Sequence, residues 1–177
     1  MRKLLPLFAL LLLFPLLAIA QDVSSLGVDM LAPVACEAQV EGSAIALYCG
    51  PTQGFYRAGE EALDLAKPYV FFGQFDCWAM VAQGTPDAFG PVGWVESALL
   101  DTLPDAPELA FENAVSAMVE EDATATNNPL TSDSAAIATL PRGTQITILA
   151  QYADWLYVQT EVENLPARIF IPANTVL

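Results

Sequence analysis

The amino-acid sequence predicts an all-β protein made of two small units in tandem. Three observations support this fold class. Short runs rich in β-branched and aromatic residues are separated by Gly, Pro, Asn, Asp and Ser; no long segment repeats its apolar residues every 3.6 positions; and one residue pattern occurs twice. We therefore expect two small β-barrels in tandem after an N-terminal leader.

The first 20 residues have the pattern of a secretory signal peptide. Arg2 and Lys3 precede an apolar stretch over residues 4–19, and small residues at positions 18 and 20 form a cleavage motif before Gln21. The alternative is an uncleaved membrane anchor, but this stretch reaches only about 24 Å as a helix, against a hydrocarbon core of about 30 Å. We expect cleavage after residue 20, a secreted or extracytoplasmic protein of the cell surface or envelope, and no membrane association after cleavage.

The composition is strongly acidic. The 177 residues include 21 Asp and Glu against six Lys and Arg, a formal charge of −15, and loss of the two charges of Arg2 and Lys3 takes it to −17. Such a surface repels phosphate backbones and anionic headgroups, which argues against nucleic acid and membrane surfaces as partners. Cationic partners remain open, beside the plainer explanation that the charge keeps an exported protein soluble.

The segment CEAQVEGSAIALYC predicts a β-hairpin with a disulfide across it. Gly42 and Ser43 form a favoured two-residue turn. This turn sets Cys36 opposite Cys49 at a non-hydrogen-bonded position, where Cα atoms lie about 4.5 Å apart, within reach of a disulfide. We predict the bridge Cys36–Cys49 and a buried free thiol at Cys77. The rival pairing joins Cys49 to Cys77, through a bulge that shifts the hairpin register.

The repeat is anchored at Trp78 and Trp155. A glutamine, an aromatic and an acidic residue precede each tryptophan, in GQFDCW and AQYADW, and a valine follows three places after it. Pro51 lies 27 residues before the first tryptophan, Pro129 lies 26 before the second, and both copies end at a leucine 22 residues after it. This agreement of spacing indicates a tandem repeat of one small β-unit.

The repeat divides the chain that follows the leader into four segments. Between the copies, residues 101–116 hold Pro104, Pro107 and four carboxylates, which indicates a stiff acidic connector. The predicted segments are an N-terminal lead at 21–31, a first unit at 32–101, a linker at 102–112 and a second unit at 113–177.

Strand alternation predicts which side of each tryptophan-bearing strand is buried. Ala79 and Val81 share one face in the first unit, with Trp78 on the other, and Leu156 and Val158 share the matching face in the second. The aliphatic faces are expected to be core, and the tryptophan faces to stay at least partly accessible.

The motifs of the two units resemble the bacterial SH3 domains. The resemblance rests on a strand that runs into a GP or NP turn at 50–51 and 128–129, on the step LPRG before a β-run, on the pattern aromatic-x-x-W-x-x-V, and on GPVGWVESALL. The second unit departs from it by IFI at 169–171 in place of GWV, and the first lacks the glycine step. The resemblance implies two SH3-like barrels that bind extracellular peptides, cell-wall components or partner proteins.

The residue content argues against catalysis. No histidine is present, which rules out Cys-His and Ser-His nucleophile pairs and histidine metal sites. The acidic pairs at 60–61 and 120–122 lie among turn residues, where a solvated face is the ordinary explanation, and no calcium-loop or phosphate-loop spacing occurs. We expect a non-enzyme with no catalytic residue, metal site or cofactor.

Aromatic residues supply the candidate ligand-binding surface. Rings offer a large contact area at little entropic cost, and carboxylates around them favour cationic peptide groups. Trp94 could line such a groove, but for Trp94 and Phe170 core packing is the favoured interpretation. The predicted ligand-binding residues are Tyr48, Phe55, Tyr56, Trp78, Trp155 and Tyr157.

Two functions follow from these observations. The first is a non-catalytic exported binding module that recognises an extracellular peptide, cell-wall polymer or partner protein. The alternative is a structural or interaction protein of the cell envelope whose two domains pack on each other. The first predicts Trp78 or Trp155 exposed beside a groove, and the alternative predicts these rings buried between the two units.

Overall fold

The computed structural model describes residues 26–39, 44–105, 108–131 and 136–176, so the predicted leader lies outside the described residues. The strands confirm the all-β class, and no helix in these ranges is long and apolar enough to span a membrane. In chain order the elements are β1 (Asp29–Met30), β2 (Val34–Cys36), β3 (Ala44–Ala46), β4 (Ala62–Asp64), β5 (Tyr69–Phe75), β6 (Trp78–Thr85), β7 (Ala88–Glu96), η2 (Ser97–Leu99), β8 (Val115–Met118), β9 (Ala123–Thr126), β10 (Ala136–Leu140), β11 (Gln145–Tyr152), β12 (Trp155–Val162), β13 (Leu165–Pro172) and η3 (Ala173–Thr175).

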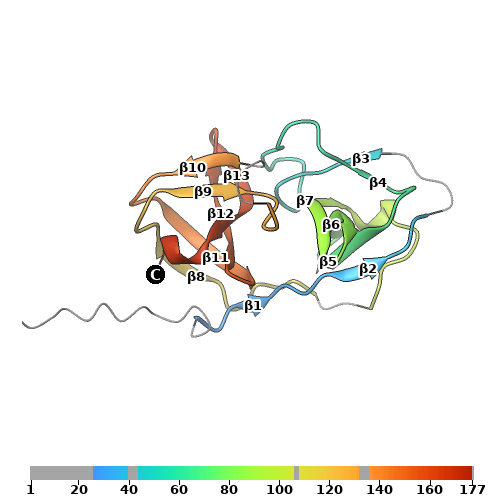
Figure 1. Ribbon diagram of the computed structural model, residues 1–177, viewed down its shortest axis with the longest axis horizontal. Coiled ribbons are helices and arrows are strands. Elements are labelled where there is room, and N and C mark those ends of the chain that lie inside the picture. Colours follow the sequence, from blue (N-terminus) through green and yellow to red (C-terminus); the bar gives the residue numbers. More distant parts are fainter. Residues whose placement is uncertain (1–25, 40–43, 106–107, 132–135, 177) are drawn as a thin grey trace, which may run out of the picture.

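The strands form two lobes that lie side by side (Figure 1). The first lobe, β2 to β7, has a sheet in the order β2-β5-β6-β7 and a separate ribbon of β3 and β4. The second lobe, β8 to β13, has the order β11-β12-β13-β9-β10, with β8 also paired to β11. The N-terminal β1 belongs to the second sheet, because it runs parallel to β11.

The two small barrels that the sequence predicts are not closed. Across the described residues, strand pairing in neither lobe returns from the last strand of a sheet to the first. β2, β3 and β4 have three residues each. A strand of that length spans only about 10 Å, which leaves little overhang for the staggered register that closes a barrel.

The lobes share the same geometry at the two tryptophans. Trp78 begins β6 and Trp155 begins β12, and each follows a tight turn from the preceding strand. The residue two places before each tryptophan has a positive φ, 58° at Asp76 and 49° at Ala153. Such values are uncommon outside glycine, so both turns hold the backbone in a less favoured conformation.

The repeated glutamine closes this turn. Gln74 Nε2 donates to the carbonyl oxygen of Asp76 at 2.6 Å, and Gln151 Nε2 donates to that of Ala153 at 2.8 Å. Each glutamine therefore satisfies the carbonyl of the positive-φ residue two places ahead. This contact explains why glutamine recurs four residues before both tryptophans.

The predicted hairpin between Cys36 and Cys49 is wrong. β2 pairs with β5, where Cys36 lies opposite Tyr69, and β3 pairs with β4, where Ile45 lies opposite Leu63. The predicted turn at 42–43 lies outside the described residues. Each strand of the expected hairpin therefore pairs with a distant strand of the first lobe, and the local turn signal does not decide the pairing.

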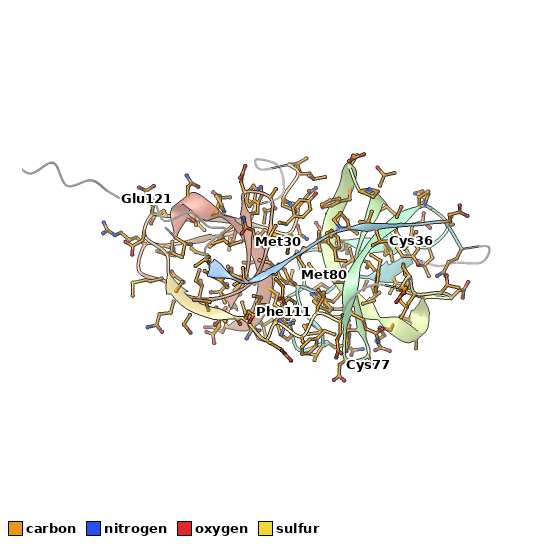
Figure 2. All side chains as sticks on the ribbon, turned by 90° about the horizontal axis from the view of Figure 1, so that it is seen from below. Met30, Cys36, Cys77, Met80, Phe111 and Glu121 are labelled. Carbon is orange, nitrogen blue, oxygen red and sulfur yellow. The ribbon has the colours of Figure 1, made fainter. Side chains whose placement is uncertain are left out.

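The predicted disulfide and the buried position of Cys77 are also wrong. All three cysteines are free thiols, so neither Cys36–Cys49 nor the rival Cys49–Cys77 bridge forms. Cys49 is buried in an apolar cluster with second-lobe residues, whereas Cys77 is exposed in the turn before β6. Figure 2 shows Cys36 and Cys77 on different sides of the first lobe.

We expect thiol reactivity to follow this burial. Exposed Cys77 should react first with a disulfide reagent, half-buried Cys36 more slowly, and Cys49 only after unfolding, because burial raises the pKa of Cys49 to about 12. The measurement is the time course of labelling, with mass mapping of each modified peptide. Without reductant, the denatured protein should titrate three thiols; one thiol would show that a disulfide forms.

Each lobe has its own aliphatic core. Ala79 and Val81 of β6 are fully buried in the first-lobe core, beside Leu63. Leu156 and Val158 of β12 are fully buried in the second-lobe core. The prediction that the aliphatic faces of these strands are core is confirmed.

Candidate functional site

The tryptophan-bearing faces of β6 and β12 are turned toward each other. They meet in a third buried cluster, which we call the aromatic junction. Figure 2 shows Met80 and Phe111, two of its members, where the lobes meet. The buried members are Leu31, Val70, Phe72, Trp78, Met80, Ala82, Phe89, Val92, Trp94, Leu109, Phe111, Leu149, Ala150, Tyr157 and Phe170. Both faces of β6 are therefore covered, and the expectation of an accessible tryptophan face is wrong at Trp78, whereas Trp155 is only partly buried.

A hydrogen bond between the lobes lies at the centre of the junction. Trp94 Nε1 donates to Tyr157 Oη at 2.7 Å, and both residues are almost fully buried. Phe170 packs on the Tyr157 ring, with centroids 4.9 Å apart. Trp94 and Phe170 have 0% exposure, which confirms the interpretation that they are core residues. Burial raises the pKa of Tyr157 above its usual range, so its hydroxyl stays protonated.

The segment that precedes each lobe in the chain pairs with the other lobe. Leu31, just before β2, donates its backbone N–H to Gln151 O of the second lobe at 2.8 Å. Leu109, before β8, donates to Gln74 O of the first lobe at 2.7 Å. Gln74 and Gln151 are the equivalent glutamines of the repeat, so the lead of each lobe pairs with the same place on the other.

A second pair of backbone contacts obeys the same relation. Arg168, two residues before Phe170, donates its N–H to Cys49 O at 2.6 Å. Val92, two residues before Trp94, donates to Asn127 O at 2.7 Å. Cys49 and Asn127 each lie two residues before the proline of their repeat. Equivalent positions of the two lobes therefore make equivalent contacts across the junction. This is the relation found at the isologous interface of a two-fold dimer, but here both halves belong to one chain.

Arg168 brings a positive charge into the junction. Its guanidinium carbon lies over four rings, with centroid distances of 5.5 Å to Phe55, 5.0 Å to Phe75, 5.8 Å to Trp94 and 5.2 Å to Phe111. Ring faces carry partial negative charge and attract a cation, the more so where water is excluded. The rings of the first lobe and of the linker thereby hold an arginine of the second lobe.

The guanidinium is only partly satisfied by hydrogen bonds. Nε donates to Gln159 Oε1 at 3.1 Å, but Nη1 is buried and has no partner among the described residues. Burial lowers the pKa of Arg168, and the nearby Tyr157 hydroxyl opposes that shift. The contacts with the four aromatic rings are therefore the main interactions that stabilise the buried charge of Arg168.

The predicted ligand-binding residues lie in or beside the junction. Trp78 is 8% exposed and Tyr157 is 1% exposed, so both rings are buried. Tyr48 and Trp155 pack partly buried at the margin of the cluster, and Tyr48 makes an edge contact with Trp78. Phe55 lies against Arg168, while Tyr56 packs on the second-lobe core.

Sequence reasoning missed Arg168, Phe75 and Phe111. Arg168 had a usable signal, because it is one of four basic residues after residue 20 and lies in the apolar run ARIFI. A charge within such a run needs a partner once buried. Phe111 lies in the linker, where nothing in the pattern indicated burial.

A small polar pocket opens at one edge of the junction. Its volume is about 250 Å³, and it lies between the loop at 56–61 and the second lobe. Asn127 Nδ2 donates to the Glu61 carboxylate across this pocket. Loss of hydration raises the pKa of Glu61, and the Asn127 hydrogen bond opposes that shift. The lining residues are Tyr56, Ala58, Gly59, Glu61, Asn127, Ala136 and Ile137.

The remaining titratable side chains do not form a metal-binding group. In the part of the chain that the structure describes, no three His, Cys, Asp or Glu side chains lie close enough together to hold a metal ion. Comparison with protein-family models, with curated proteins and with solved structures gives no match.

Proposed function

We propose that the protein is a non-catalytic, exported interaction protein of the cell envelope in which two bacterial-SH3-like units act as one rigid body. The observation that carries this proposal is the burial of Trp78 and Tyr157 between the lobes. The rings that would serve a ligand in a free unit contact the other unit instead. The partner then binds the outer surface of the joined lobes.

The charge of that surface favours a cationic partner. Among the described residues there is one ion pair, between Lys67 Nζ and Asp64 Oδ2 at 2.9 Å. Nearly all acidic side chains in this part of the chain therefore lack a basic partner. A surface with this excess charge attracts cations and raises their association rate. Extracellular peptides, wall polymers with free amino groups and basic proteins fit this requirement.

Binding to a wall polymer tests the proposal. The chain from Gln21 is mixed with purified peptidoglycan at low ionic strength, sedimented, and measured in the pellet. We expect retention that is lost near 1 M salt, where the Debye length is about 3 Å. Peptidoglycan whose amino groups are acetylated is the control and should retain little. No retention at low salt, or equal retention after acetylation, would contradict a cationic wall partner.

A further inference from the structure

The pocket at the edge of the junction has walls fixed by both lobes. Tyr56 donates its backbone N–H to Pro166 O at 2.8 Å, which anchors the loop of the first lobe on the second. Asn127 is held in turn by the hydrogen bond from Val92 N to its carbonyl oxygen. Exposed Gly59 and Ala136 line the mouth, so the pocket is open to solvent. Neither lobe alone forms this site.

The pocket is also where the two-fold relation of the junction breaks. Cys49 and Asn127 occupy equivalent positions, but Cys49 packs in an apolar cluster, whereas Asn127 contacts Glu61. Asn127 is 3% exposed, and its Oδ1 is buried with no hydrogen-bond partner among the described residues. A buried amide oxygen without a hydrogen-bond partner lowers the stability of the fold, because it has lost its hydrogen bonds to water. A ligand that donates a hydrogen bond would remove this cost.

The groups in the pocket match an ammonium ion. An ammonium has three N–H donors and no acceptor, and the pocket offers the Glu61 carboxylate and Asn127 Oδ1 as acceptors. One carboxylate balances one positive charge. Calcium, in contrast, takes six to eight oxygen ligands, which this pocket does not supply.

We propose that this pocket binds the primary ammonium group of a lysine-like side chain on an extracellular peptide or wall polymer. The inference rests on the proposed function and names the chemical group that the partner presents. Glu61 provides the charge and Asn127 a hydrogen-bond acceptor.

An NMR titration with Nα-acetyl-lysine amide tests the proposal on the chain from Gln21. We expect saturable shifts of the backbone amides of Gly59, Asn127 and Ala136. Glu61→Gln, which keeps the size of the side chain, should weaken binding roughly tenfold or more, the worth of a charged hydrogen bond. Glu60→Gln removes the same charge from the neighbouring exposed residue and should bind as the parent does. The Nε-acetylated compound, which has no ammonium, should produce no saturable shifts.

Any one of three results would contradict ammonium binding in this pocket: no shifts in the parent protein, equal binding by Glu61→Gln, or equal binding of the Nε-acetylated compound. Thermal unfolding of Glu61→Gln separates loss of binding from loss of fold. The peptidoglycan experiment is independent of these outcomes. If peptidoglycan retained the parent chain and Glu61→Gln equally, the proposed function would stand, but this pocket would not be the binding site.

Discussion

Replacement of Trp94 by alanine is expected to lower the free energy of unfolding by about 3–5 kcal/mol, the range for loss of a large buried aromatic side chain. The substitution empties the centre of the junction and removes the hydrogen bond to Tyr157. The Tyr157 hydroxyl, left buried without this partner, accounts for part of that loss. A domain has only about 5–15 kcal/mol in total, so the variant should be close to unfolding at ambient temperature. Urea denaturation measures the effect.

Two variants serve as controls for Trp94→Ala. Trp94→Phe keeps a ring where the equivalent position already holds Phe170, so it should lose less than half as much stability. Leu99→Ala, at a residue that is 46% exposed, should change stability by no more than about 0.5 kcal/mol. A loss below about 1 kcal/mol for Trp94→Ala would mean that the junction contributes little to the fold.

Arg168→Glu is expected to destabilise the protein by about 3–5 kcal/mol, the cost of an uncompensated buried charge. The new carboxylate would face rings whose faces are partly negative, including those of Phe75 and Phe111, in place of a cation that they attract. The midpoint of urea denaturation measures the loss. It should fall sharply although the protein's overall charge changes by only two.

Arg168→Met is the matched control, because methionine is long, apolar and adaptable. It loses an attraction to the rings worth about 2 kcal/mol, but it also relieves the desolvation of the guanidinium and its unpartnered Nη1. We expect a change within about 2 kcal/mol. If the glutamate variant were as stable as the methionine variant, the ring contacts with Arg168 would not depend on its charge.

The sequence predicted the parts of the fold that depend on short-range periodicity. Alternation along WAMVA and WLYVQ placed the aliphatic residues in the two cores, and spacing matched Trp94 with Phe170. The same alternation failed at Cys77, because that residue lies in a turn where the positive φ of Asp76 breaks the two-residue period. It also could not tell whether the tryptophan faces meet solvent or a second lobe, since aromatic residues suit both surroundings.

The misassigned hairpin and the missed junction share a physical cause. Gly42-Ser43 is a sound local turn signal, but β2 pairs with β5 and β3 pairs with β4, so the partner of each strand lies outside the reach of that signal. The pairing of each leading segment with the other lobe likewise joins residues far apart in sequence, as in the bond from Leu31 to Gln151. Contacts between residues far apart in the chain produce no periodic pattern in the sequence.

Differential scanning calorimetry of the chain from Gln21 tests most directly whether the junction makes the two lobes one body. We expect a single transition whose van't Hoff enthalpy equals the calorimetric enthalpy, because neither lobe can unfold without exposing the shared aromatic cluster. Trp94→Ala should lower the temperature of that one transition. Two separate transitions, or a van't Hoff enthalpy near half the calorimetric value, would show that the lobes unfold independently and that the junction does not make them one body.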